Sequence, residues 1–436
     1  MTRQSDRRQQ VSKRLMTRRL AAGGAAAMVA ALAIPSLTAA GGAAAASVSR
    51  ADGRTARQAA AASGGTLRAW GANGLGQLGD GTTSNSDVPV KVKLPPGTRI
   101  TSARVGCDHA LALTSSGEVL AWGNNNTGQL GDGTTGSSSV PVKVLLPPGT
   151  KVTAIRAGCA DSLALTSDGQ VLAWGFNGDG QLGTGTPGGS SATPVPVLLP
   201  AGTTVTAITA GTAHNLALTS KGKVLAWGFN ADMELGDGTV GSLSATPGQV
   251  LLPPGVKVTA VAAGDSHSLA RTSNGKVLAW GDNRNGELGT GKSGGNSATP
   301  VRARLARGTR VRGLFGGCAY TMVLTSKHKV LAWGANGHGE LGDGTFRQRD
   351  TPVRPRLPKG IKVTAISAAC EYGLARTSKG KVLAWGFNGS GELGDGSTTD
   401  SPLPVRVKLP AGLAAVSLGA GPAADSTLAV VRKAKP

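Results

Sequence analysis

The stretch SLALTSDGQVLAWGFNGDGQLG, residues 162–183, contains the unit from which most of the chain is built. Two short apolar runs lie on either side of Ser167-Asp168-Gly169, and a glycine-rich segment follows the second run. Runs of this length are typical of strands and too short for helices. Because Gly169 tolerates a positive φ angle, we expect the two runs to form a β-hairpin. One copy of the unit has His328 in place of this glycine.

The unit recurs seven times. All seven tryptophans of the chain fall at the same place in the repeat, and the gaps between them are 52 or 53 residues: Trp70, Trp122, Trp174, Trp227, Trp280, Trp333 and Trp385. Each copy also has a proline-rich run, such as residues 351–355, which suits an edge strand because proline has no N–H for the ladder. Four short strands in each of seven copies predict an all-β, seven-bladed β-propeller of four-stranded antiparallel blades.

The two ends of the repeat array predict how the ring closes. The first copy begins in the second half of a repeat, at residues 66–70, and the chain ends with residues 426–430, which match the first half. We therefore expect the N- and C-terminal strands to pair in one shared blade. The predicted organisation is an export signal at 1–46, a flexible linker at 47–64, the propeller at 65–431 and a basic tail at 432–436.

The repeat resembles a known family. Gly-x-x-His-x-Leu-Ala-Leu-Thr, at residues 106–114 and 211–219, is joined to Val-Leu-Ala-Trp-Gly and a Gly-Gln-Leu-Gly-Asp-Gly-Thr cassette. This combination resembles the regulator of chromosome condensation repeat family over about residues 65–431, and the resemblance implies a seven-bladed propeller without determining a function. The eukaryotic member that gave the family its name acts on a small GTPase through an inserted wedge. The even tryptophan spacing leaves no room for such an insertion, so we do not expect nucleotide exchange here.

The first 46 residues predict export. Seven Lys and Arg residues precede an apolar run at 20–34 and a series of small residues with several Ala-x-Ala-like cleavage sites. Cleavage after Ala46 would lower the formal net charge from +22 to +16, because seven basic residues and Asp6 would leave. We expect a secreted or cell-envelope protein of bacterial type, with no integral membrane span after cleavage. Both the twin-arginine and the general route remain open.

The charge of the body allows two interpretations. A strongly basic protein favours acidic partners, such as anionic cell-surface polymers or acidic protein faces. However, the body has no dense Lys/Arg block, which is also typical of charges spread over loop surfaces for solubility.

Three histidines share one repeat position, His109, His214 and His267, and Asp161 holds it in another copy. A metal arc would need such a set, but hydrogen bonding within each blade explains the histidines more simply. Five aspartates, at 80, 132, 237, 343 and 395, are expected to cap turns, because Thr184 and Thr290 replace them in two copies. No nucleophile, phosphate-loop or zinc motif occurs. We expect no catalytic residues, metal or cofactor.

The four cysteines also share one repeat position and fall in two pairs from adjacent copies, Cys107 with Cys159 and Cys318 with Cys370. In an oxidising compartment these pairs could form disulfides between blades, while four buried thiols are the alternative.

Binding specificity is expected in the segments that differ among copies. These are 83–88, 135–140, 186–193, 239–246, 292–299, 346–351 and 398–401, together with the unusual residues Met233, Phe315, Tyr320, Arg347, Arg349 and Tyr372. We expect a monomeric, non-catalytic, extracytoplasmic scaffold whose rim loops bind a protein or an anionic surface polymer, with no specific nucleic acid. The alternatives are an inhibitor of an extracellular enzyme, as in the architecturally similar β-lactamase inhibitory protein II, and a cryptic hydrolase or lyase.

Overall fold

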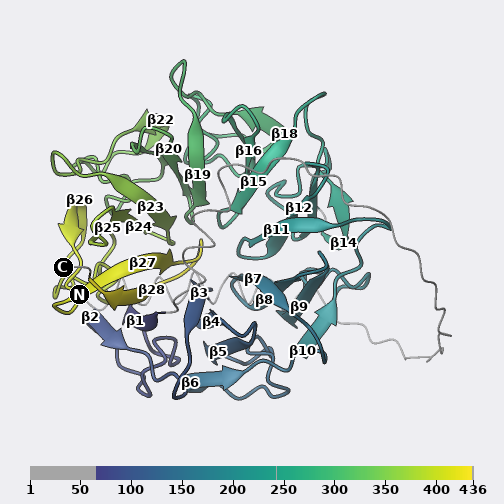
Figure 1. Cartoon of the computed structure of the whole chain (residues 1–436). Coiled ribbons are helices and arrows are strands. Elements are labelled where there is room, and N and C mark those ends of the chain that lie inside the picture. Colours follow the sequence, from purple (N-terminus) through teal and green to yellow (C-terminus); the bar gives the residue numbers. More distant parts are fainter. Residues whose placement is uncertain (1–64, 242, 435–436) are drawn as a thin grey trace, which may run out of the picture. The chain divides into compact units, whose positions relative to one another are not determined.

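The computed structural model describes residues 65–241 and 243–434, and all the regular structure among them is β-strand. The strands form seven four-stranded antiparallel sheets, which are the blades of a ring (Figure 1). The predicted seven-bladed propeller is therefore confirmed. The predicted export signal and linker lie outside the described residues.

We number the blades by their tryptophans, from Trp70 in blade 1 to Trp385 in blade 7. Blade 1 contains β27 (Leu413–Gly419), β28 (Ser426–Lys433), β1 (Thr66–Gly71) and β2 (Ser86–Lys91). Blade 2 contains β3 (Ile100–Val105), β4 (His109–Thr114), β5 (Val119–Gly123) and β6 (Ser138–Lys143). Blade 3 contains β7 (Val152–Ala157), β8 (Asp161–Thr166), β9 (Val171–Phe176) and β10 (Ser190–Pro196). Blade 4 contains β11 (Val205–Ala210), β12 (His214–Thr219), β13 (Val224–Gly228) and β14 (Ser244–Gln249).

The remaining blades repeat this order. Blade 5 contains β15 (Val258–Ala263), β16 (His267–Thr272), β17 (Val277–Gly281) and β18 (Ser297–Arg302). Blade 6 contains β19 (Val311–Gly316), β20 (Tyr320–Thr325), β21 (Val330–Gly334) and β22 (Arg349–Val353). Blade 7 contains β23 (Val363–Ala368), β24 (Tyr372–Thr377), β25 (Val382–Gly386) and β26 (Ser401–Arg406). In each blade the first strand lies nearest the axis of the ring and the proline-rich fourth strand lies at its edge (Figure 1).

Blade 1 closes the ring as predicted. Strand β1 pairs with β28 over six consecutive residues, from Thr66 opposite Val431 to Gly71 opposite Ser426. Strand β28 continues to Lys433, so the expected basic tail at 432–436 is wrong for its first two residues, which extend the ladder opposite Leu413 and Ala414. The closure therefore uses a longer C-terminal strand than the repeat pattern indicated.

The tryptophans hold neighbouring blades together. All seven are fully buried, and each indole N–H donates a hydrogen bond of 2.7–2.9 Å to a backbone carbonyl of the preceding blade. The acceptor is always the Gln or Glu of the glycine-rich cassette, for example Gln77 for Trp122. Since the donor and its acceptor belong to different blades, the invariant tryptophan spacing reflects the packing of one blade on the next.

The cassettes fold through side-chain hydrogen bonds to the backbone. Asp80 and its four equivalents each accept hydrogen bonds from the N–H and the hydroxyl of the residue two positions later, which confirms the predicted turn caps. Each cassette also contains a buried asparagine that was not predicted from the sequence. In blade 2, for example, Asn125 Oδ1 accepts from Leu130 N and Asn125 Nδ2 donates to the carbonyls of Thr134 and Gly136.

The hairpin turns use the left-handed backbone as predicted. Gly169 has a φ of 84°, and His328, which replaces the glycine in blade 6, has a φ of 60°. His328 Nδ1 lies 2.9 Å from the carbonyl oxygen of Val363 in blade 7, so this side chain joins two blades.

Candidate binding surfaces

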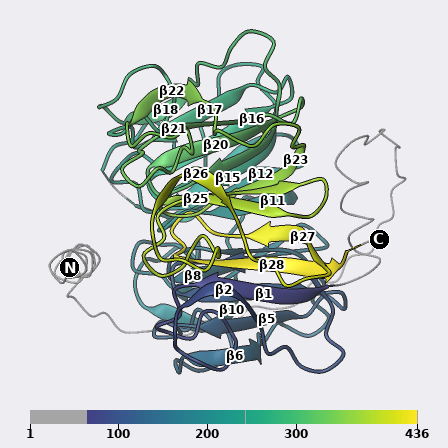
Figure 2. The ribbon, with the colours of Figure 1, turned by 90° about the vertical axis from the view of Figure 1, so that its left-hand side faces the viewer.

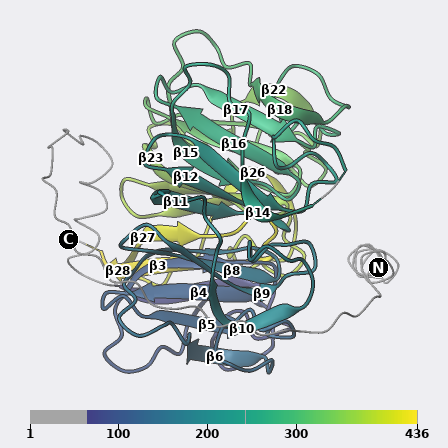
Figure 3. The ribbon, with the colours of Figure 1, turned by 90° about the vertical axis from the view of Figure 1, so that its right-hand side faces the viewer.

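The strand order gives the ring two different faces. One face carries the turns between second and third strands and the connections from one blade to the next; Ser326 N, for example, donates to Arg310 O at 2.8 Å. We call this the hairpin-turn face. The other, the cassette face, carries the loops between first and second strands and the cassettes between third and fourth strands. Figures 2 and 3 show the ring from its edge, with β28 ending at the hairpin-turn face.

The hairpin-turn face is strongly basic. Its turns (115–118, 167–170, 220–223, 273–276, 326–329 and 378–381) and the ends of its connections (94–99, 146–151, 199–204, 252–257, 305–310 and 357–362) carry fourteen Lys and Arg residues but only two acids, Glu118 and Asp168. Both acids lie in blades 2 and 3. The positive charge of this face is therefore concentrated in blades 4 to 7, where the loops contain no acid.

We call that concentration the basic arc. It comprises twelve exposed side chains in blades 4 to 7 and their connections: Lys221, Lys223, Lys257, Lys276, Arg307, Arg310, Lys327, Lys329, Lys359, Lys362, Lys379 and Lys381. No acid occurs in the loops that carry them. The loop charges of these blades therefore gather on one face, because the repeat places the same loop of every blade on the same face.

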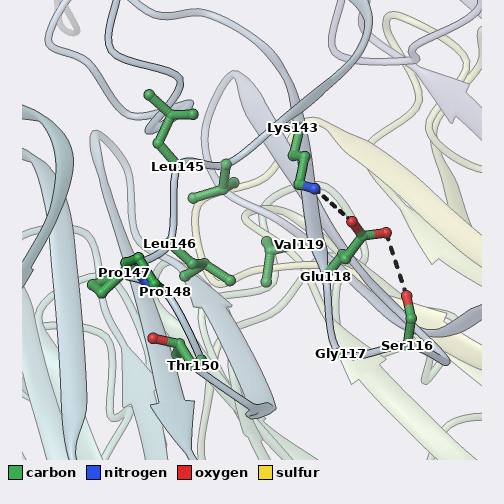
Figure 4. Close-up of a pocket in the computed structure, with 12 residues that line it drawn as sticks. Ser116, Gly117, Glu118, Val119, Lys143, Leu145, Leu146, Pro147, Pro148 and Thr150 are labelled. Carbon is green, nitrogen blue, oxygen red and sulfur yellow. Dashed lines mark hydrogen bonds and ion pairs between the residues drawn. The ribbon is translucent and has the colours of Figure 1, made fainter.

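Two pockets at equivalent repeat positions show the difference between the two halves of this face. In blade 2 the pocket is lined by residues 116–119 and 143–150, and Lys143 Nζ lies 2.6 Å from Glu118 Oε1 (Figure 4). In blade 5 the pocket has Lys276 in place of Glu118, and Arg302, Arg307 and Arg310 also line it. The blade 5 pocket thus offers four cations to an anion, whereas the blade 2 pocket holds an ion pair.

The cassette face has the opposite charge. Apart from Glu118 and Asp168, every acid between residues 65 and 434 lies in a cassette-face loop or at a strand end that adjoins one. These loops contain few cations: Arg284, Lys292 and Arg347. Arg284 is itself bound by acids, with Nη2 2.7 Å from Asp282 Oδ2 and 3.3 Å from Asp232 Oδ2.

Four buried glutamates lie beneath this face, Glu234, Glu287, Glu340 and Glu392, where blades 1 to 3 have Gln77, Gln129 and Gln181. Burial raises the pKa of Glu234 and of Glu392 to about 8, and raises the pKa of the other two carboxyls as well. Each accepts a hydrogen bond from the backbone N–H two residues earlier, as the glutamines do. Glu392 Oε1 is buried without a hydrogen-bond partner among the described residues.

The loops between first and second strands, which we call the axial loops, surround the axis of the cassette face. They contain Asp108, Asp265, Glu371 and Asp425 but no Lys or Arg. In every blade the last axial-loop residue accepts a backbone hydrogen bond from the residue after Trp-Gly, and that residue is Phe in three blades: Phe176, Phe229 and Phe387. All three rings are half-buried. Around the axis, acids therefore occur in blades 1, 2, 5 and 7, and aromatic rings occur in blades 3, 4 and 7.

The three histidines make hydrogen bonds between blades. The prediction that they bond within each blade is therefore wrong. His109 Nε2 lies 2.9 Å from Ser162 Oγ, His214 Nε2 lies 2.9 Å from Ser268 Oγ and His267 Nε2 lies 3.0 Å from Thr321 Oγ1. Burial lowers the pKa of His109 and His267 to about 4 and that of His214 to about 3, which keeps the rings neutral. Within residues 65–241 and 243–434 no group of three or more His, Cys, Asp or Glu side chains could hold a metal ion.

Two of the six residues proposed for the binding surface are buried, and for them the prediction is wrong. Tyr320 is 1% exposed and Tyr372 is 0% exposed. They occupy the histidine position, where the side chain points into the next blade: the Tyr320 hydroxyl donates to Tyr372 O at 2.5 Å, and the Tyr372 hydroxyl lies 2.9 Å from Thr427 Oγ1.

The other four residues differ in exposure. Phe315 is half-buried and packs against the cluster formed by blades 6 and 7. Met233 is half-buried with a φ of 67°, at the place where the other cassettes have glycine. Arg349 is tied to Asp343, with Nη2 3.0 Å from Oδ2. Arg347 is exposed, next to Phe346, which is 57% exposed. The exposed surface around Phe346 and Arg347 is the part of the predicted binding surface that a partner can reach.

Both disulfides that the cysteine positions allowed are present, so the alternative of four buried thiols is wrong. Cys107 is bonded to Cys159 and Cys318 to Cys370, with Cα–Cα distances of 4.5 and 4.4 Å. No cysteine is free. The bonds join axial loops of blades 2 and 3 and of blades 6 and 7. Within the described part of the chain, no helix is long and apolar enough to cross a bilayer.

Comparison with known proteins identifies the repeat. Residues 66–424 match the model of the RCC1-like domain. The chain is 31% identical to the ultraviolet-B receptor UVR8 of Arabidopsis thaliana over 345 residues, which cover 78% of this chain and 77% of the receptor. It is 32% identical to the human E3 ubiquitin-protein ligase HERC2 over 78% of this chain but only 7% of the ligase.

Solved structures share the fold. Yeast RCC1 (Prp20), solved bound to Kap60, superposes with a TM-score of 0.77 and 24% identity, covering 86% of this chain and 90% of that one. Human WBSCR16 superposes with a TM-score of 0.75 and 24% identity, covering 85% of this chain and all of the other.

Proposed function

Because the chain belongs to the RCC1-like domain family, whose propellers serve as binding and regulatory scaffolds, we propose that it is a non-catalytic scaffold that acts outside the cytoplasm and binds an anionic surface polymer through the basic arc. The observation that carries this proposal is the placement of twelve exposed cations on one side of one face, with no acid in their loops. Such a patch attracts polyanions over a range set by ionic strength.

The blade 5 pocket is the best-defined anion position within the arc. Lys276, Arg302, Arg307 and Arg310 line it, and guanidinium groups bind phosphate or carboxylate oxygens in pairs. A polymer with regularly spaced phosphates could contact this pocket and the paired lysines of the neighbouring turns, Lys327 with Lys329 and Lys379 with Lys381. The partner is thus an extended polyanion.

The location outside the cytoplasm is supported by the cysteines and by the N-terminal sequence. All four cysteines of the chain are paired in disulfides, which persist in oxidising compartments. The basic and apolar pattern of residues 1–46 is typical of an export signal. Membership of a family whose propellers serve mostly as binding or regulatory scaffolds supports a non-catalytic role.

The test compares two variants with the same net charge. The arc variant carries Lys327→Gln, Lys329→Gln, Lys379→Gln and Lys381→Gln. The control variant carries Lys93→Gln, Arg304→Gln, Arg356→Gln and Lys408→Gln, four cations that follow the outer strands and do not belong to the arc. Binding to immobilised poly(glycerol phosphate) is measured at low and high salt, with neutral dextran as the blank.

We expect the arc variant to lose about tenfold or more in affinity at low salt and the control variant to lose about twofold. Equal losses in the two variants would show that net charge alone attracts the polymer and would refute a role for the arc. Retention of full affinity by the arc variant would also refute a role for the arc.

A further inference from the structure

The cassette face carries a charge pattern that polymer binding does not use. Its axial loops contain four acids and no Lys or Arg, although the chain as a whole has a formal net charge of +22. The two signs of charge are therefore separated by repeat position. In most blades whose loops are charged, the hairpin turns carry cations and the axial loops carry acids. A face of this kind attracts cations even though the whole protein repels them at long range.

A half-buried phenylalanine ring stands beside one of these acids. Phe387 N donates to Glu371 O at 2.9 Å, so the ring and the carboxylate belong to one corner of blade 7. The rings of Phe176 and Phe387 lie over Gly178 and Gly389, where a Cβ would collide with them. An aromatic ring next to a carboxylate is suited to Lys and Arg side chains, because the ring face attracts a cation and the carboxylate accepts its hydrogen bonds.

Basic side chains of the protein itself already contact acids on this face. Arg284 is held between Asp282 and Asp232, two residues from neighbouring cassettes. His338 Nδ1 lies 2.7 Å from Asp400 Oδ2, its Nε2 lies 3.9 Å from Glu371 Oε1, and its ring meets the Phe387 ring edge-on with the centroids 5.2 Å apart. These internal contacts show which side chains the surrounding acids and rings accept.

We propose that the axial acids and phenylalanines of the cassette face form a second binding site, which takes a Lys- or Arg-bearing loop of a partner protein. The exposed residues Val240 and Phe346, which are 65% and 57% exposed, lie in variable cassettes of the same face and add apolar contact at its rim. Since the basic arc occupies the opposite face, one molecule can hold an anionic polymer and a cationic protein at the same time. The bridging role rests on the proposed polymer binding, whereas the second site does not.

The experiment uses a labelled deca-arginine peptide as the probe. The axial variant carries Asp265→Thr, Glu371→Ala and Asp425→Ala, residues that other blades have at the same positions as Thr212, Ala319 and Ala213. The control variant also removes three acids, through Asp87→Asn, Asp350→Asn and Asp168→Asn, which lie outside the axial loops. A third variant carries Phe229→Ala and Phe387→Ala, matching Ala72 and Ala335 of other blades.

We expect the wild type to bind the peptide in spite of its positive net charge, the axial variant to lose about tenfold or more, and the control to lose about twofold. The phenylalanine variant should weaken binding by about threefold or more, while thermal melting of every variant confirms the fold. Absence of peptide binding by the wild type, or equal losses in the axial and control variants, would overturn the second site.

The two sites are separated by their variants. The arc variant should keep its affinity for the peptide and lose the polymer, and the axial variant should do the reverse. Polymer-coated beads bind the cationic peptide directly, so bridging is measured as the additional peptide that is retained when wild-type protein is added. If both single sites behave as expected and the protein adds no retained peptide beyond this blank, bridging is refuted while both binding sites stand.

Discussion

The most informative single position in the repeat is the residue after the cassette glycine. It is glutamine in blades 1 to 3 and glutamate in blades 4 to 7, and both types are buried and make the same backbone hydrogen bond. An amide is neutral at every pH, whereas a buried carboxyl has to remain protonated or be charged at the cost of its hydration. The four glutamate blades therefore carry a pH dependence that the three glutamine blades lack.

A double variant, Glu234→Gln with Glu392→Gln, tests this position. Burial raises the pKa of both carboxyls from 4.5 to about 8, so their stabilising contribution is complete below pH 4.5 and is lost as the pH rises through about 8. This contribution is lost between about pH 4.5 and pH 8, so we expect the free energy of unfolding of the wild type to fall more than that of the variant from pH 6.5 to about pH 8 and to level off above that. Denaturant titrations at several pH values measure this.

The reverse substitution provides the control. Gln77→Glu places a carboxyl beside Asp108, to which Gln77 Nε2 now donates at 3.3 Å, and should add pH dependence in the same range. The buried histidines act in the opposite direction: their lowered pKa values mean that stability is lost as the pH falls below 6.5 toward 4, so the effect of the glutamates is measured above pH 6.5. A Glu234→Gln/Glu392→Gln variant with an unchanged slope above pH 6.5 would contradict the assignment.

At the scale of strands and loops, the fold followed from the spacing of the tryptophans and from the position of the half-repeats at the two ends. The turn caps could also be predicted from the sequence, because Asp80 and its equivalents cap turns through atoms close in sequence. Contacts between blades were harder to predict from the sequence. Tyr320 and Tyr372 looked like surface residues because they were unusual, yet they share the position of His109, whose side chain reaches into the next blade.

The charge separation could have been found from the sequence and was missed. Counting charges along the chain shows no dense block, whereas counting them by repeat position puts lysines in Ser-Lys-Gly-Lys turns and acids in cassettes. What the sequence could not supply is the direction of each side chain across a blade boundary, since this depends on how the blades pack.

The two disulfides are matched elements of the ring. Each joins axial loops of adjacent blades, and each spans 52 residues of sequence. Because the closed segments are equally long, the loss of unfolded-chain entropy is the same for both. We expect Cys107→Ser with Cys159→Ser to lower the free energy of unfolding by up to about 4 kcal/mol, and Cys318→Ser with Cys370→Ser to lower it by a similar amount.

Denaturant unfolding with and without a reducing agent measures this. Reduction of the wild type should approach the effect of removing both bonds and should leave a variant without cysteines unchanged. Losses under about 1 kcal/mol for both pairs would mean that the blades are held in register without the bonds.

At the scale of the whole ring, opposite faces of opposite charge make the molecule directional. A protein drawn to a polyanion by the basic arc should settle with its hairpin-turn face toward the polymer and its cassette face toward solvent. We expect a fluorophore on Ser273→Cys, in a hairpin turn, to be shielded from iodide quenching by bound poly(glycerol phosphate). A fluorophore on Ser293→Cys, in a cassette, should stay accessible.

Both positions are exposed in the free protein, so their quenching should be similar without polymer. Equal shielding of the two labels would mean that the protein binds in no preferred orientation. Shielding of the cassette label alone would contradict the assignment of the polymer to the basic arc.

The shared first blade has a practical consequence for any surface assay. The start of β1, at Thr66, lies opposite Val431 near the end of β28, and both strand ends open onto the hairpin-turn face. A tag or support attached at either of these strand ends therefore approaches from the side of the basic arc. Immobilisation through these strand ends would crowd out a polymer while leaving the cassette face accessible, whereas coupling through a cassette loop would do the opposite.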